Sequence, residues 1–149
     1  MSNLHELYQE LILDHGRKPR FCFKPDSYTV DTEGYNPLCG DKVHLYATVQ
    51  NGIVASVSFE GQGCAISMAS TSLMLEIAQQ RSLVELRALF HAWHDALMQN
   101  TPCCAEHEAI LHKCFILKGV QQYPARVKCA TLAWHTLENL LQKVEANHE

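Results

Sequence analysis

The sequence has no long hydrophobic run and no excess of positive charge. None of its apolar segments approaches the ~18 residues that a membrane-spanning helix needs, and its opening stretch is acidic and amphipathic, unlike a signal peptide. Twelve lysines and arginines stand against sixteen aspartates and glutamates, giving a formal net charge of −4, which excludes a generally basic nucleic-acid or membrane-surface protein. We therefore expect a cytoplasmic protein with neither nucleic acid nor membrane as partner.

The sequence also lacks internal repeats, low-complexity tracts and any Cys-x-x-Cys pair. Its 149 residues, 47% of them hydrophobic, are enough for one buried core and too few to need two, so we expect a single domain over residues 1–149. Cysteine, in contrast, is abundant: there are seven, an odd number that a complete set of disulfides cannot use. Without an export signal, these cysteines are better interpreted as thiols or metal ligands.

The clearest local pattern is a β-hairpin over residues 43–60. Apolar and polar residues alternate on both sides of Asn51-Gly52, a pair that supplies the two positive φ angles of a type I′ turn. A third, weaker strand is predicted over residues 28–31.

Helical spacing dominates the rest of the chain. A first helix is predicted around residues 4–12, with Asn3 as its cap, followed by a loop over 17–25. Further helices are predicted after the hairpin, over residues 65–80, 82–99 and 105–118, with a last one ending near 144. Strands followed by helices, without strand–helix alternation, indicate an α+β fold with helices packed on one face of a small antiparallel sheet.

Three cysteines lie where predicted elements meet. Cys39 precedes the first hairpin strand, Cys64 follows the second, and Cys129 is near the start of the last helix. Because the hairpin strands have nearly equal lengths, Cys39 and Cys64 are expected at the same end of the sheet. A helix N-terminus lowers the pKa of a thiol placed there, and Cys64 and Cys129 both fit this description.

Three thiolates and one carboxylate make a plausible tetrahedral set for zinc, and Asp41 offers the carboxylate two residues after Cys39. Such a site carries net negative charge, which nearby Arg126 and Lys128 could compensate. Spacing alone leaves the alternative open, because the intervals from 39 to 64 and from 64 to 129 match no short zinc-finger pattern. The cysteines could equally be small buried hydrophobic residues.

The motifs NPLCGD, FEGQGCAIS and PARVKCATLAW, in this order around a hairpin, resemble IscU/NifU-type iron–sulfur cluster assembly proteins, and more closely their SufU branch. The resemblance extends from LYQELILDH to HTL near residue 137. It implies a SufE/NifU-like fold and a pyridoxal-phosphate (PLP)-dependent cysteine desulfurase, SufS-like, as the upstream partner. It also implies downstream assembly or acceptor proteins. By the same resemblance, the metal ligands are Cys39, Asp41, Cys64 and Cys129.

Two departures from the IscU pattern favour the SufU branch. Lys128 stands where IscU proteins have histidine, and an additional stretch includes the region 99–107. SufU proteins are associated with zinc-dependent sulfur transfer, so the resemblance implies Zn²⁺ as cofactor. Cys39 is expected to accept the sulfur, since the loop around Gly40 should be more mobile than a helix start. The alternatives are a scaffold that holds iron or a transient [2Fe–2S] cluster, and a purely structural zinc adaptor.

Other candidate ligands are less convincing. His107-Glu108 with His112 resembles His-Glu-x-x-His, but the second histidine comes one residue late and points ~140° away at about 100° per residue. His91 and His94 could share a helix face, although their apolar neighbours indicate an ordinary amphipathic helix. The four remaining cysteines match no motif and are interpreted as buried or incidental thiols: Cys22, Cys103, Cys104 and Cys114.

Overall fold

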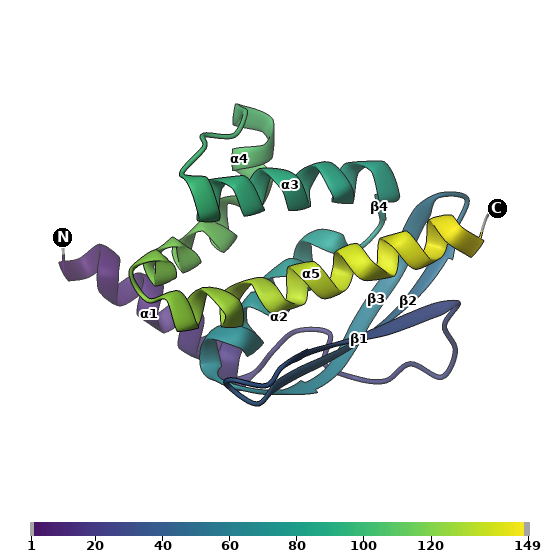
Figure 1. Cartoon of the computed structure of the whole chain (residues 1–149), viewed down its shortest axis with the longest axis horizontal. Coiled ribbons are helices and arrows are strands. Elements are labelled where there is room, and N and C mark those ends of the chain that lie inside the picture. Colours follow the sequence, from purple (N-terminus) through teal and green to yellow (C-terminus); the bar gives the residue numbers. More distant parts are fainter. Residues whose placement is uncertain (1, 148–149) are drawn as a thin grey trace.

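The computed structural model describes the backbone of residues 2–147 and the side chains of residues 9–146. A four-stranded antiparallel sheet, in the order β1-β2-β3-β4, carries helices on one face (Figure 1). Its strands are β1 (Val30–Asn36), β2 (Asp41–Gln50), β3 (Ile53–Gln62) and β4 (Arg81–Ser82). This architecture confirms the α+β prediction.

The predicted hairpin is formed by β2 and β3. Asn51 and Gly52 have φ angles of 54° and 76°, as a type I′ turn requires. This tight turn fixes the register, which pairs Lys42 with Gln62 despite an irregularity between Thr48 and Val49. The residues just before β2 and just after β3 therefore lie side by side, as predicted.

Strand β1 is longer and later than the predicted strand at 28–31. Beyond the partly buried Val30, its inward face carries Thr32, Gly34 and Asn36, none of them a large apolar residue. A Cβ atom at Gly34 would overlap Oγ1 of Thr136, so the helix above it packs directly on the strand backbone. The alternation that normally reveals a strand is therefore missing from this sequence. The two-residue β4 was not predicted at all.

Within residues 2–147 the structure has five α-helices and one 3₁₀-helix: α1 (Ser2–Arg17), α2 (Ala65–Ala78), α3 (Leu83–Gln99), α4 (Ala105–Leu111), η1 (His112–Gln122) and α5 (Pro124–Asn147). The helix predicted over 105–118 was wrong beyond Leu111, where the chain continues as the 3₁₀-helix η1. From the end of α4 onward, buried side chains recur at every third position, at 111, 114, 117 and 120, with Ile116 buried as well, which matches three residues per turn. The expected cap at Asn3 lies outside the described side chains.

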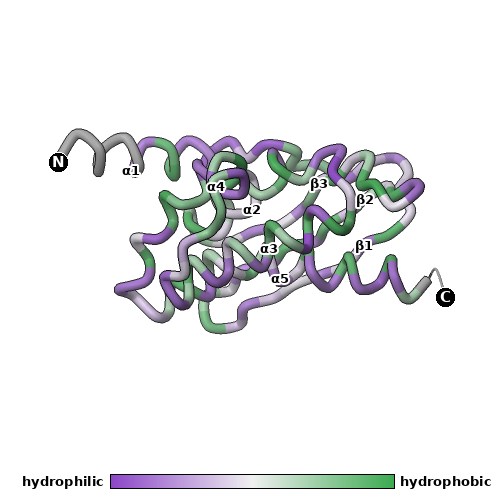
Figure 2. The backbone as a smooth tube through the Cα atoms, turned by 90° about the horizontal axis from the view of Figure 1, so that it is seen from above, coloured by the Kyte–Doolittle hydropathy of each residue, from purple (hydrophilic) through white to green (hydrophobic). Residues whose placement is uncertain are grey.

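Helices α2 and α5 lie against the sheet, and α3 packs on α5 from the far side (Figure 1). Trp93 of α3 and Trp134 of α5 are fully buried and stack with ring centroids 5.1 Å apart. Figure 2 shows α1 at one end of the molecule and the last turns of α5 at the other. Within residues 2–147, none of the helices combines the length and apolar character needed to cross a membrane.

Candidate metal centre

One end of the sheet brings together four segments that are distant in sequence. The tight turn 37–40 joins β1 to β2, with Asn36 opposite Asp41 in the ladder and Gly40 at a φ of 70°. Helix α2 begins just after the end of β3, and the second turn of α5 lies above the same end of the sheet. Three of the four predicted ligands are close together as a result.

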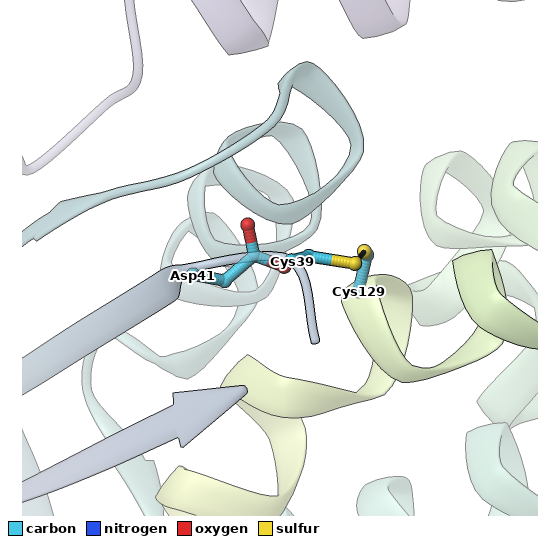
Figure 3. Close-up of side chains that lie close together, drawn as sticks. All are labelled: Cys39, Asp41 and Cys129. Atoms are coloured by element: carbon cyan, nitrogen blue, oxygen red, sulfur yellow. Dashed lines mark hydrogen bonds between the residues drawn. The ribbon is translucent and has the colours of Figure 1, made fainter. Parts of the chain in front are cut away.

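The side chains of Cys39, Asp41 and Cys129 converge (Figure 3). One ligand atom from each lies within 4.8 Å of the others, and the two Sγ atoms are 3.3 Å apart. Across the described part of the chain, no other group of three or more cysteine, histidine or acidic side chains converges in this way. Thiolate and carboxylate are the donor types that zinc accepts.

Cys64 lies beside this group as the N-cap of α2. Its Sγ accepts a hydrogen bond from the Ser67 N–H at 3.4 Å, and its own backbone N–H donates to Oδ1 of Asp41 at 3.0 Å. Its side chain is near enough to Cys129 to contribute to the raised pKa of that thiol. The structure thus places Cys64 at the site but aims its sulfur at the helix, and its role as a ligand stays a prediction.

Asp41 is completely buried, and only half of its carboxylate is satisfied. Oδ1 accepts the Cys64 N–H, whereas Oδ2 has no hydrogen-bond partner among the described residues. Gly63 makes room for this group, because a Cβ atom there would overlap Oδ1. An unpartnered buried acceptor costs on the order of 1–3 kcal/mol. A cation beside the two thiols would remove that cost, so the residues present fit a bound metal.

Cys129 differs from the expectation for a thiol at a helix N-terminus. It is the sixth residue of α5, past the first turn with its free N–H groups. Burial raises the pKa of Cys129 above its usual value, and the neighbouring Cys39, Asp41 and Cys64 raise it further. The prediction of a helix-lowered pKa was therefore wrong for this residue. A bound cation would reverse the effect by favouring the thiolate.

The two predicted compensating cations, Arg126 and Lys128, are both exposed on α5. Neither takes part in the ion pairs found among the described residues. Lys128 lines a surface cavity of about 360 Å³ together with Pro37 and Leu38 of the Cys39 turn. This places one cation next to the turn, and charge compensation stays a prediction.

Asn36 is a site residue that the sequence analysis did not single out. It is 6% exposed, and its Nδ2 lies 4.0 Å from the Sγ of Cys129. Its Oδ1 accepts the backbone N–H of Leu38 at 3.3 Å. The available signal was an asparagine directly before the Pro-x-Cys turn, a position where its side chain can bond to the backbone two residues later.

The residues that were set aside lie elsewhere. His94 packs against both Phe90 and His135, with ring centroids 5.6 and 5.3 Å away, and belongs to no converging ligand group among the described residues. Cys114 is buried in the core, where burial strongly raises its pKa. Cys104 caps α4 with its Sγ. Cys22 is exposed and Cys103 half-buried.

Comparison with known proteins gives a match to the NifU-like N terminal domain over residues 7–130. The chain is 40% identical over 139 residues to the iron–sulfur cluster assembly scaffold protein IscU of Thermotoga maritima, covering 93% of this chain and 94% of that protein. It is 36% identical over 148 residues to the zinc-dependent sulfurtransferase SufU of Bacillus subtilis, covering 99% and 97%. A SUF-system scaffold protein from Fervidobacterium islandicum superposes with a TM-score of 0.79 at 33% identity, over 92% of this chain and 98% of that one.

Proposed function

Because the chain belongs to the NifU-like N-terminal domain family, we propose that it works in iron–sulfur cluster assembly, as a zinc-bound acceptor of sulfur. The sulfur would come from a PLP-dependent cysteine desulfurase of the SufS type in the cytoplasm. Downstream assembly or acceptor proteins would receive it. The relative named as a zinc-dependent sulfurtransferase supports this choice, since it aligns with almost the whole chain.

The observation that carries the proposal is the convergence of two thiols on a half-satisfied buried carboxylate. Cys39, Asp41 and Cys129 supply three donor atoms within 4.8 Å of one another, and Oδ2 of Asp41 lacks a hydrogen-bond partner within the described part of the chain. We assign these three residues, with Cys64, as the zinc ligands. When bound, zinc keeps thiolates deprotonated at neutral pH.

Cys39 is the residue assigned to accept sulfur. Its side chain is half-buried in a short turn, whereas Cys129 is completely buried in α5. Gly40 follows it with a positive φ angle that a residue with a side chain rarely adopts. The Cys39 turn therefore offers the more accessible sulfur, and the one that can move without disturbing a helix.

The transfer itself is a thiol exchange. The Cys39 thiolate attacks the terminal sulfur of the persulfide on the desulfurase, forming one S–S bond as the S–S bond of the donor breaks. The donor cysteine leaves as a thiolate, and Cys39 becomes a persulfide. No external oxidant or reductant is needed, because the sulfur keeps its oxidation level throughout. Asp41, Cys64 and Cys129 would hold the zinc, which when bound would keep the two cysteine thiols deprotonated.

A scaffold role is the second candidate. The same donor set is suited to a [2Fe–2S] cluster, with Asp41 as the weaker ligand that would let the cluster leave. The relative at 40% identity carries the name of a scaffold protein. Lys128, however, adds no ligand beside Cys129 in the place where IscU proteins have histidine, so we place sulfur acceptance first.

The test is the intact mass of the zinc-loaded protein after incubation with a cysteine desulfurase and cysteine, without iron or reductant. We expect one added sulfur, mapped to Cys39, in the wild type and in a Cys22→Ser control that lacks an exposed thiol outside the site. The Cys39→Ser variant should gain none while staying folded. Sulfur that still arrives on another residue of this variant would contradict the assignment.

Two further outcomes separate the alternatives. Iron-dependent accumulation of acid-labile sulfide, with no sulfur on any cysteine in the iron-free sample, would identify a scaffold. Neither product, with zinc that is lost only on unfolding, would identify a structural zinc adaptor.

A further inference from the structure

Asn36, the last residue of β1, contacts both the Cys39 turn and Cys129 in the candidate metal centre. Its Oδ1 accepts the Leu38 N–H at 3.3 Å in the Cys39 turn, and its Nδ2 points to the Sγ of Cys129 at 4.0 Å on α5. We propose that Asn36 is a positioning residue, which holds the Cys39 turn beside Cys129 and so controls how readily Cys39 leaves the ligand group. The consequence for sulfur acceptance rests on the proposed function.

The turn has few other attachments. Among the residues that the structure describes, three hydrogen bonds outside the β-ladder hold it. Two of them end on Asn36: Leu38 donates to the side chain, and Cys39 donates to the main-chain oxygen at 3.3 Å. The third is the contact between the sulfurs of Cys39 and Cys129. Pro37 has no N–H to donate, and Leu38 is 72% exposed, so packing adds little. Residue 36 therefore fixes the turn through two bonds, of which the one from Leu38 depends on the asparagine side chain.

The chemistry at this position requires an amide. A carboxamide has an acceptor oxygen and a donor N–H₂ group on one short side chain, so it can serve the turn and the sulfur at once. Serine provides an acceptor for the Leu38 N–H but is too short to donate to Cys129, and alanine provides neither. A donor aimed at a ligand sulfur also helps to hold that ligand in its orientation toward a metal. Serine should therefore remove only the contact with Cys129, whereas alanine should remove both contacts of Asn36.

Two variants test the proposal by two measurements. The rate at which iodoacetamide modifies Cys39 is measured on the metal-free protein by peptide mass mapping, and zinc affinity is measured by competition with a chromogenic chelator. Asn36→Ala should raise the Cys39 rate by more than about threefold and lower zinc affinity by about tenfold, the lower end of the effect on metal affinity of losing a residue that orients a ligand. Asn36→Ser should lower zinc affinity similarly but leave the Cys39 rate within threefold of wild type.

The controls separate positioning from a general loss of structure. Gln50→Ala removes an exposed amide at the far end of β2 and should change neither measurement. The buried Cys114 reports unfolding, because its modification rate rises only when the core opens. If Asn36→Ala exposes Cys114, the test rests on the serine variant alone. This variant should then show a lower zinc affinity and a Cys39 modification rate within threefold of wild type.

Two results would overturn the proposal. One is an alanine variant whose Cys39 rate and zinc affinity both stay within twofold of wild type. The other is a set of variants in which the Cys39, Cys129 and Cys114 rates all rise together, as a merely structural role predicts. The modification experiment uses neither metal nor sulfur donor. A wild-type protein that takes no sulfur from a desulfurase would therefore refute the proposed function and leave the result for Asn36 standing.

Discussion

At the scale of single residues, the site depends on one backbone position with no side chain. Gly63 lies against the carboxylate of Asp41, and a Cβ atom there would overlap Oδ1. Gly63→Ala should therefore displace the carboxylate from the Cys64 N–H, lowering zinc affinity about tenfold and the free energy of unfolding by about 1–3 kcal/mol. Chelator competition and urea unfolding measure the two effects.

Gly119→Ala is the matched control for this substitution. A Cβ atom at Gly119 meets nothing within 4 Å, and its φ angle is not positive, so neither zinc affinity nor stability should change by a comparable amount. A Gly63→Ala variant that bound zinc as tightly as this control would show that the carboxylate does not need its present position.

At the scale of elements, α1 is held on α2 by a buried histidine. His15 is 1% exposed, with Nδ1 2.7 Å from the Ser72 hydroxyl and Nε2 3.6 Å from Glu76. Burial, followed by the charge of Arg20, lowers the pKa of His15 below its usual 6.5, outweighing the opposite effects of Glu76 and Asp14. The neutral form is thus the one that the folded protein prefers.

This contact should make stability depend on pH. Because the pKa is lower in the folded state, the unfolded chain binds the proton first, and the contribution of His15 is complete above about pH 6.5 and is lost as pH falls below it. Urea unfolding between pH 7.5 and about 5 should show a smaller decline for His15→Gln than for wild type. The control His91→Gln removes an exposed histidine of α3 and should keep the wild-type decline. Equal slopes for all three proteins would contradict the prediction.

The elements also show what the sequence could and could not predict. The hairpin follows from the alternation of apolar and polar residues and from Asn51-Gly52, both local signals. The position of Cys39 and Cys64 at the same end of the sheet follows from the hairpin. The prediction placed β1 too early in the sequence, because the buried face of this strand carries small and polar residues that allow α5 to approach closely. The 3₁₀ segment η1 was missed because its three-residue burial period resembles a helical one over a short window.

For the site, too, the sequence predicted the features that depend on local motifs and missed those that depend on tertiary packing. Sequence motifs identified Cys39, Asp41 and Cys129, which the fold brings together. The buried position of Cys129, the orientation of the Cys64 sulfur toward α2 and the contacts of Asn36 depend on how α5 packs over the sheet edge. Such tertiary contacts leave no periodic pattern in the chain.

At the scale of the whole molecule, the candidate metal centre joins segments that are remote in sequence. Cys39 and Cys129 are separated by 90 positions, and they belong to the sheet edge and to the last helix, respectively. A metal bound by both connects the two layers of the fold, whereas the unfolded chain offers no such preformed group. Zinc should therefore stabilise the entire domain rather than the turn alone.

The size of this effect follows from mass action. At a free zinc concentration a hundredfold above the dissociation constant, the free energy of unfolding should rise by about 2.7 kcal/mol, measured by urea unfolding with zinc and after chelation. Cys39→Ser should lose most of the increase and Cys22→Ser should keep it, since Cys22 lies outside the ligand group. Unfolding curves that coincide with and without zinc would mean that metal binds the unfolded chain equally well. Because a ligand can shift folding only by its differential affinity for the two states, that result would contradict a preformed centre.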